Sequence, residues 1–89
     1  MVRIHLIISG RVQGVGFRMF VQRAARQHRV TGFTRNLADG TVEVEAQGTA
    51  ESVKTFQLEV SMGPVHSQVT KVARSQLELQ SGEQGFNIR

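Results

Sequence analysis

Apolar and polar residues alternate at the start of the chain, and the apolar spacing then changes to that of a helix. The alternation over residues 2–9 predicts a strand with one buried face. Beyond a glycine-rich turn, the pattern over residues 17–28 predicts a helix, since apolar residues return every three or four positions. The apolar stripe of this helix comprises Phe17, Phe20, Val21, Ala24 and His28.

Two further alternating segments, residues 31–37 and residues 41–48, lie close together in the sequence. The residues between them are Ala38, Asp39 and Gly40, a composition that favours a tight turn. The two segments are therefore expected to pair as a β-hairpin. The residues expected to point inward from the second strand are Val42, Val44 and Ala46.

A second helix is predicted directly after the hairpin. The side chain of Thr49 can cap its first turn, and helical spacing continues to about Met62. Gly63 and Pro64 then end the helix. The buried stripe of this helix comprises Val53, Phe56 and Val60.

The last part of the chain is expected to return to strand structure. Val69 and Val72 are both apolar but differ in parity, which indicates a β-bulge. The remaining alternation rests on Leu77, Leu79, Phe86 and Ile88. The resulting order is βαββαβ with a short extra C-terminal strand. It predicts an α+β fold of the split βαβ type, in which two helices cover one face of a mostly antiparallel sheet.

The composition indicates one domain and favours anionic partners. The chain has 89 residues, enough for one hydrophobic core, so residues 1–89 are expected to form a single domain. It has no cysteine, which excludes disulfides and thiolate chemistry. Its net charge of +4 suits small phosphates, RNA and acidic membranes alike. The first apolar run is too short and too polar for a signal segment or a membrane span, so a cytoplasmic protein is expected.

The turn between the first strand and the first helix carries the strongest chemical signal. Gly10, Gly14 and Gly16 let the backbone turn tightly and expose successive N–H groups, and the helix N-terminus adds further free donors. A cation such as Arg18 opposes the helix dipole unless an anion binds there, and a guanidinium can hold two phosphate oxygens at once. The residues alone leave open an ordinary glycine turn followed by a solvated arginine.

Other familiar sites are disfavoured by the sequence. No Lys-Ser or Lys-Thr pair follows the glycines, and their spacing is not GxGxxG, so nucleotide hydrolysis is disfavoured. Glu43 and Glu45 are expected on a solvated strand face, and the three histidines are too scattered for a metal site. Met19 and Met62 are expected to fill gaps in the core.

Two segments of the chain resemble the signatures of the acylphosphatase family. The first runs from Ile8 to Arg18 and reads ISGRVQGVGFR; the second reads GFTRN from Gly32 to Asn36 and is followed by Gly40, Val42 and Gly48. The resemblance extends over most of the chain, including Gly63-Pro64 and the terminal Phe86–Ile88 segment. It implies a ferredoxin-like α/β sandwich and an enzyme that hydrolyses acyl phosphates without a cofactor or metal.

The resemblance also implies roles for particular residues. Arg18 would be the catalytic arginine, and Asn36 would orient the attacking water. The phosphate-binding loop would comprise Arg11, Val12, Gln13, Gly14, Val15, Gly16, Phe17 and Arg18. Inorganic phosphate is expected as product and competitive inhibitor, and a monomer without nucleic-acid or membrane partners is expected. The residues alone favour a different interpretation of Asn36, as a strand-end asparagine that bonds its own turn.

Three positions depart from the family's pattern. Thr34 stands where a small apolar residue is usual, which a strand tolerates, and Phe33 stands where a larger ring is common. Arg29 stands where glycine commonly closes the first helix. If Arg29 adopts a left-handed conformation, it costs roughly 1 kcal/mol relative to glycine.

A mechanism without a side-chain acid or base suits this chemistry. The carboxylate that leaves an acyl phosphate has a conjugate-acid pKa of about 4, so the bond breaks without a strong general acid. Arg18 and the loop N–H groups are expected to hold the phosphoryl oxygens, while Asn36 places a water in line with the scissile bond. The phosphate itself can take the proton of that water.

Two other functions remain open at this stage. A basic ferredoxin-like module could bind RNA, although the five phenylalanines mostly occupy positions expected to be buried. The chain could also be an acylphosphatase-like domain that handles carbamoyl phosphate, as found inside larger maturation proteins.

Overall fold

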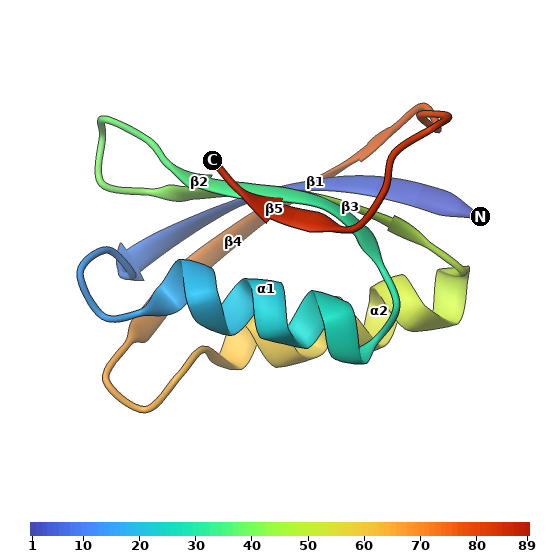
Figure 1. The fold of residues 1–89 in the computed structure, drawn as a ribbon. Coiled ribbons are helices and arrows are strands. Elements are labelled where there is room, and N and C mark those ends of the chain that lie inside the picture. Colours follow the sequence, from blue (N-terminus) through green and yellow to red (C-terminus); the bar gives the residue numbers. More distant parts are fainter.

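A five-stranded sheet carries two helices on one of its faces in the structure, a computed structural model that describes residues 1–89 (Figure 1). In chain order the elements are β1 (Val2–Arg11), α1 (Phe17–Gln27), β2 (Thr31–Asn36), β3 (Val42–Gly48), α2 (Ala50–Met62), β4 (Gln68–Leu77) and β5 (Phe86–Ile88). The predicted βαββαβ order with a short extra strand is confirmed, as is the placement of both helices on one face. Neither helix is long and apolar enough to cross a membrane.

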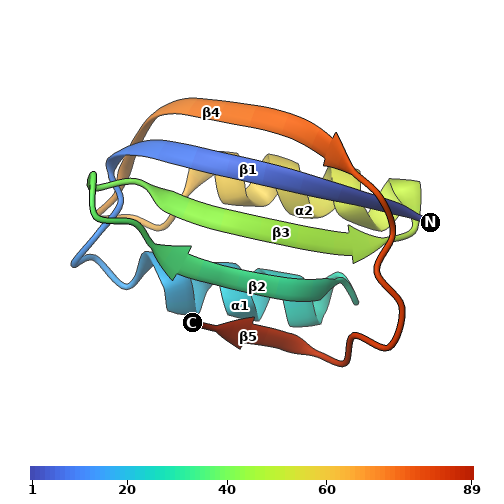
Figure 2. The same cartoon turned by 90° about the horizontal axis from the view of Figure 1, so that it is seen from above.

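The strands lie in the order β4-β1-β3-β2-β5, with β1 and β3 in the interior and β4 and β5 at the edges (Figure 2). All neighbours are antiparallel except β2 and β5, which run parallel. The predicted bulge is present, since Ser9 pairs with Lys71 and Gly10 pairs with Val69, which leaves Thr70 without a partner. At Gly10 a Cβ would lie 2.0 Å from the Gln68 carbonyl oxygen, so the bulge requires glycine there.

The core lies between the sheet and the helices. It includes the inward residues predicted for β1, β3 and α2: Ile4, Leu6, Ile8, Val42, Val44, Ala46, Val53, Phe56 and Val60. On α1 the stripe is shifted, because Ala25 is fully buried while Phe20 and His28 are half-buried. The His28 ring instead bonds Glu59 on α2 at 2.7 Å. The expectation that Met19 and Met62 fill core gaps is wrong, since their faces of the helices point to solvent and both are largely exposed.

A buried arginine on the open face of the sheet fixes the loop between β4 and β5. Arg3 is only 2% exposed and donates hydrogen bonds to Glu45 (2.9 Å), Gln47 (3.2 Å) and Glu83 (2.8 Å). The hydrogen bonds from Arg3 hold the pKa of Glu83 below its ordinary value, although burial opposes the shift. This contact ties the connecting loop to the sheet and so helps to place β5.

Helix α1 ends in a left-handed residue that is not glycine. Arg29 has a φ of 58°. Its N–H donates to the Arg26 carbonyl (3.3 Å), and the N–H of Val30 donates to the Ala25 carbonyl (2.9 Å). These two bonds form a Schellman motif, and Ala25 and Val30 are both buried beneath it. Arg29 therefore adopts the left-handed conformation considered from the sequence, at a cost of roughly 1 kcal/mol relative to glycine.

We predict that Arg29→Gly raises the free energy of unfolding by about 1 kcal/mol, because glycine adopts positive φ without a steric penalty. Chemical denaturation of the two proteins measures this difference. Arg29→Ala is the matched control: it removes the charge but keeps a Cβ at the left-handed position, so it should not stabilise. An equal gain in both variants would mean that relief of charge repulsion, and not of backbone strain, is responsible.

We also predict that Glu83→Gln lowers the free energy of unfolding by about 1–3 kcal/mol at pH 7, because it weakens a charge-assisted contact to buried Arg3. Since the pKa of Glu83 is lowered in the fold, its contribution is present above the ordinary value of 4.5 and is lost as pH falls through the folded pKa. Urea denaturation of both proteins should therefore show a difference in the free energy of unfolding at pH 7 that becomes smaller at acid pH. Exposed Glu78 lies in the same loop, and Glu78→Gln should change little at either pH.

Candidate active site

The turn between β1 and α1 is held by anchors at both of its ends. Val12 and Phe17 are each 1% exposed and pack into the core. Between them, the side-chain amide of Gln13 donates to the carbonyls of Leu37 (2.8 Å) and Thr41 (2.9 Å), which belong to the β2–β3 connection. The turn is therefore fixed both to the core and to the hairpin that follows Asn36.

Two glycines give this turn its shape. Gly14 and Gly16 both have a φ of 74°, and a Cβ at either position would meet nothing within 4 Å. Glycine is favoured there by the backbone dihedral and not by lack of space. Gly16 is also the N-cap of α1 in a left-handed conformation, and no side chain caps the helix.

A run of backbone N–H groups in this turn has no acceptor within the chain. The N–H groups from Val12 to Met19 donate no backbone hydrogen bond, and the first bond of the helix is Phe20 N–H to Gly16 carbonyl at 3.1 Å. The only backbone N–H groups that donate to side chains are those of Thr41, Ser52 and Gln80. Successive free donors at a positive helix end, with no acidic residue in the first turn, form a strong environment for an anion.

A cavity of about 160 Å³ lies over this turn. It is lined by Val12, Gly14, Gly16, Phe17, Arg18, Met19, Asn36 and Ile88. Arg18 is half-buried at its wall and takes part in none of the ion pairs of the chain. The cavity thus combines one unpaired guanidinium with the free N–H groups of the turn.

Asn36 enters the cavity from the end of β2. Its register partner is Val42, whose side chain is fully buried on the helix-covered side of the sheet, so Asn36 faces the same side as α1. Its Oδ1 atom is buried and accepts no hydrogen bond. Asp39, not Asn36, bonds the hairpin turn, since Asp39 Oδ1 accepts from the Thr41 N–H at 3.0 Å. The Asn36 amide is therefore an unused polar group at the cavity wall.

Most of the residues predicted for the site lie together, but three do not line the cavity. Arg11 is exposed at the end of β1, Gln13 bonds the hairpin, and Val15 packs against the core. Alternate residues of a tight turn point in different directions, so a continuous stretch cannot all face one ligand. Sequence reasoning missed Met19, which follows Arg18 directly, and Ile88, which reaches the cavity only because β5 pairs with β2.

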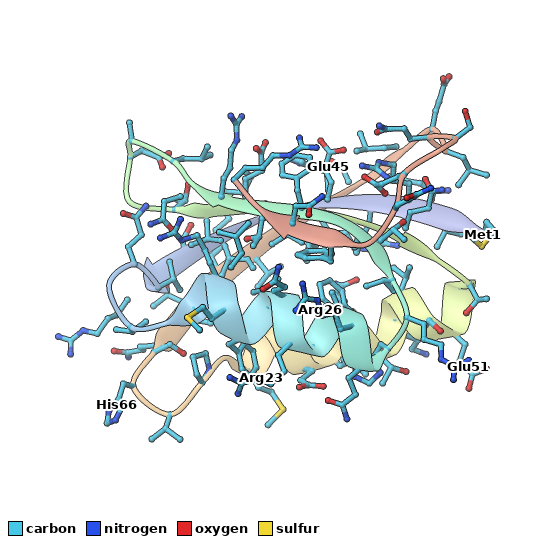
Figure 3. All side chains as sticks on the ribbon, viewed as in Figure 1. Met1, Arg23, Arg26, Glu45, Glu51 and His66 are labelled. Atoms are coloured by element: carbon cyan, nitrogen blue, oxygen red, sulfur yellow. The ribbon has the colours of Figure 1, made fainter.

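The cavity wall contains no His, Asp or Glu side chain. In Figure 3 the labelled Glu45 lies on the open face of the sheet, and Glu51 lies on α2, both away from the β1–α1 turn. Three or more His, Asp or Glu side chains nowhere come together in a way that could hold a metal ion. The chemistry available at the cavity itself is therefore that of a cation, backbone donors and a carboxamide.

Comparison with known proteins identifies the family. A family model described as Acylphosphatase matches residues 4–88. The acylphosphatase of Chlorobaculum tepidum is 48% identical over 86 residues, which cover 97% of this chain and 94% of that protein. The acylphosphatase of Bacillus licheniformis is 47% identical and covers 99% of this chain and 98% of that protein.

Solved structures agree with this assignment. The crystal structure of acylphosphatase from Bacillus subtilis has a TM-score of 0.96 at 36% identity, and the match covers 100% of this chain and 99% of that one. HypF from T. kodakarensis has a TM-score of 0.87 at 28% identity, but the match covers only 12% of that chain. The family match and the full-length relatives lead to one conclusion: this chain is an enzyme of the acylphosphatase family.

Proposed function

We propose that the chain hydrolyses the carboxyl–phosphate bond of acyl phosphates to a carboxylate and inorganic phosphate, by direct in-line attack of water without a metal ion. One observation carries this proposal. A single cavity holds an unpaired guanidinium, a run of free backbone N–H groups and a buried carboxamide oxygen without a partner. This combination suits a small dianion together with one ordered water.

The phosphoryl group would bind between the turn and Arg18. The free N–H groups of the turn residues that line the cavity would donate hydrogen bonds to its oxygens, and the dipole of α1 adds positive potential. The Arg18 guanidinium can hold two of these oxygens and neutralise charge that develops on them in a loose transition state. Inorganic phosphate presents the same oxygens, so it should compete with the substrate.

The attacking water would be held by Asn36. The Asn36 amide lines the cavity and has no hydrogen-bond partner in the chain, so it can bond this water and direct the water oxygen at phosphorus. A new bond forms between the water oxygen and phosphorus while the bond between phosphorus and the acyl oxygen breaks. The carboxylate leaves with the bonding electrons, and the proton of the water passes to the phosphate. No side-chain acid is required, because the leaving carboxylate is a weak base with a conjugate-acid pKa of about 4, and no side-chain base is required, because the phosphate takes the proton of the water.

The match to a part of HypF favours a second candidate, an acylphosphatase-like domain that acts together with a larger protein. We propose carbamoyl phosphate as the ligand in that case. The acylphosphatases of Chlorobaculum tepidum and Bacillus licheniformis match this chain over nearly their whole lengths, however. An acylphosphatase is therefore the function that we favour.

The open face of the sheet argues against RNA binding. Its aromatic side chain is Phe33, which is buried at 7% exposure and covered by the Arg89 guanidinium at 4.0 Å from the ring centroid. Arg3 and Arg35 on the same face pair with Glu45 and Glu43, so these two arginines are not free to bind a phosphate backbone. Bases stack on exposed aromatic rings, and this face offers none.

We predict that Arg18→Ala lowers kcat/KM for benzoyl phosphate by at least about 100-fold, because the guanidinium supplies transition-state charge stabilisation. The fold should be retained and slightly stabilised, since a cation is removed from the positive end of α1. A spectroscopic assay in EDTA and a thermal melt measure the two effects. Arg29→Ala removes an exposed arginine outside the cavity and should leave turnover unchanged. Normal turnover by folded Arg18→Ala protein would rule out the proposed role.

We predict that Asn36→Ala lowers kcat by about 100-fold while the inhibition constant of inorganic phosphate stays within a factor of about two. The reason is that Asn36 acts on water and not on the phosphoryl oxygens. Steady-state kinetics with phosphate as inhibitor separate the two effects. Asn87→Ala, at an exposed position of β5, is the control. Loss of phosphate affinity with unchanged kcat would assign Asn36 to phosphate binding instead.

A further inference from the structure

A second hollow adjoins the cavity on the outer side of α1. It has a volume of about 210 Å³ and is lined by Met19, Gln22, Arg23 and Arg26. Met19 lines both spaces, so the second hollow begins where the wall of the first ends. Arg23 and Arg26 are labelled on α1 in Figure 3.

The two arginines of this hollow are not neutralised by protein groups. Both are exposed, and neither takes part in the ion pairs of the chain, which involve Arg3, Arg35, His5 and His28 as the basic partners. Helix α1 contains no acidic residue at all. Arginines three residues apart on one helix repel each other, so the arrangement favours an anion between them.

The spacing along α1 relates this hollow to the phosphoryl site. Arg18 and Arg23 are five residues apart, which corresponds to a rise of about 7.5 Å along the helix axis, and the rise from Arg18 to Arg26 along the same axis is about 12 Å. The flexible, apolar side chain of Met19 lies between them at the junction of the two spaces. The Gln22 amide donates to the Phe86 carbonyl at 2.9 Å, which fixes that wall of the hollow against β5. A short acyl chain with its phosphoryl group at Arg18 can therefore extend past Met19 toward Arg23 and Arg26.

We propose that this hollow is a subsite for an anionic group at the far end of the acyl chain. The enzyme would then prefer acyl phosphates that carry a second anion, either a carboxylate or a phosphate. Both groups present oxygens in the geometry that a guanidinium fork binds. The inference rests on the proposed function, because it names the substrates for which the same active site is best suited.

The test compares substrates that differ only at this end. Butyryl phosphate and succinyl phosphate have acyl chains of equal length, with a methyl group and a carboxylate at the terminus respectively. Wild-type kcat/KM should be higher for succinyl phosphate. The ratio of the two kcat/KM values should fall about threefold in Arg23→Gln or Arg26→Gln and about tenfold in the double variant, as expected for exposed ion pairs. High salt should reduce the same ratio in the wild type. A third substrate, 3-phosphonopropionyl phosphate, shows whether a terminal phosphonate is preferred to a carboxylate.

Matched controls separate a subsite from a general charge effect. Lys54→Gln removes one positive charge at an exposed position of α2 and should leave the ratio of the two kcat/KM values unchanged. An equal fall for both substrates in the arginine variants, or a ratio that none of them changes, would overturn the subsite while leaving the proposed function intact. Failure of the wild type to hydrolyse either substrate would overturn the proposed function and the subsite together.

Discussion

The structure depends on one local constraint: a run of backbone N–H groups, from Val12 to Met19, that donates to nothing within the chain. Unpaired donors are costly when buried, so a fold retains them only where the surrounding structure holds them in place. Here the support comes from Val12 and Phe17 in the core and from left-handed Gly14 and Gly16. Arg18 is also unfavourable at this place, because its positive charge lies at the positive end of the helix dipole and no acidic residue stands in the first turn. Both features become favourable together when an anion is bound.

The sheet order explains why the proposed water-holding group lies beside this turn. β1 and β2 are separated by β3 and are joined through α1, so the end of β2 lies next to the start of the helix. Asn36 is the last residue of β2, and Gln13 bonds the chain just beyond it through Leu37. The Gln13 side chain therefore links the β1–α1 turn to the β2–β3 connection without lining the cavity. We expect this contact to hold Asn36 in place relative to the turn.

Local sequence signals are sufficient to predict the helices and strands of this fold, but they do not predict which distant segments come into contact. The alternation in β1 and β3, the Thr49 cap and the bulge near Val69 are local features, and each was predicted within a few residues. The assignment of Arg18 and Asn36 came from a family resemblance rather than from periodicity. Ile88 at the cavity wall could not be anticipated, because nothing local specifies which sheet edge β5 joins.

Two arginines on the open face of the sheet have carboxylate partners, whereas the arginines of α1 have none, and this difference bears on function. On the open face, Arg3 and Arg35 are each matched by carboxylates of β3 or of the following loops. On α1, the arginines have no such partners, although the chain could have paired them at i and i+4 with a single glutamate. Part of the positive charge of the chain therefore lies on Arg18, Arg23 and Arg26 without a carboxylate partner. Beside the cavity, the potentials of these guanidinium groups and of the helix dipole add together and attract small anions from solution.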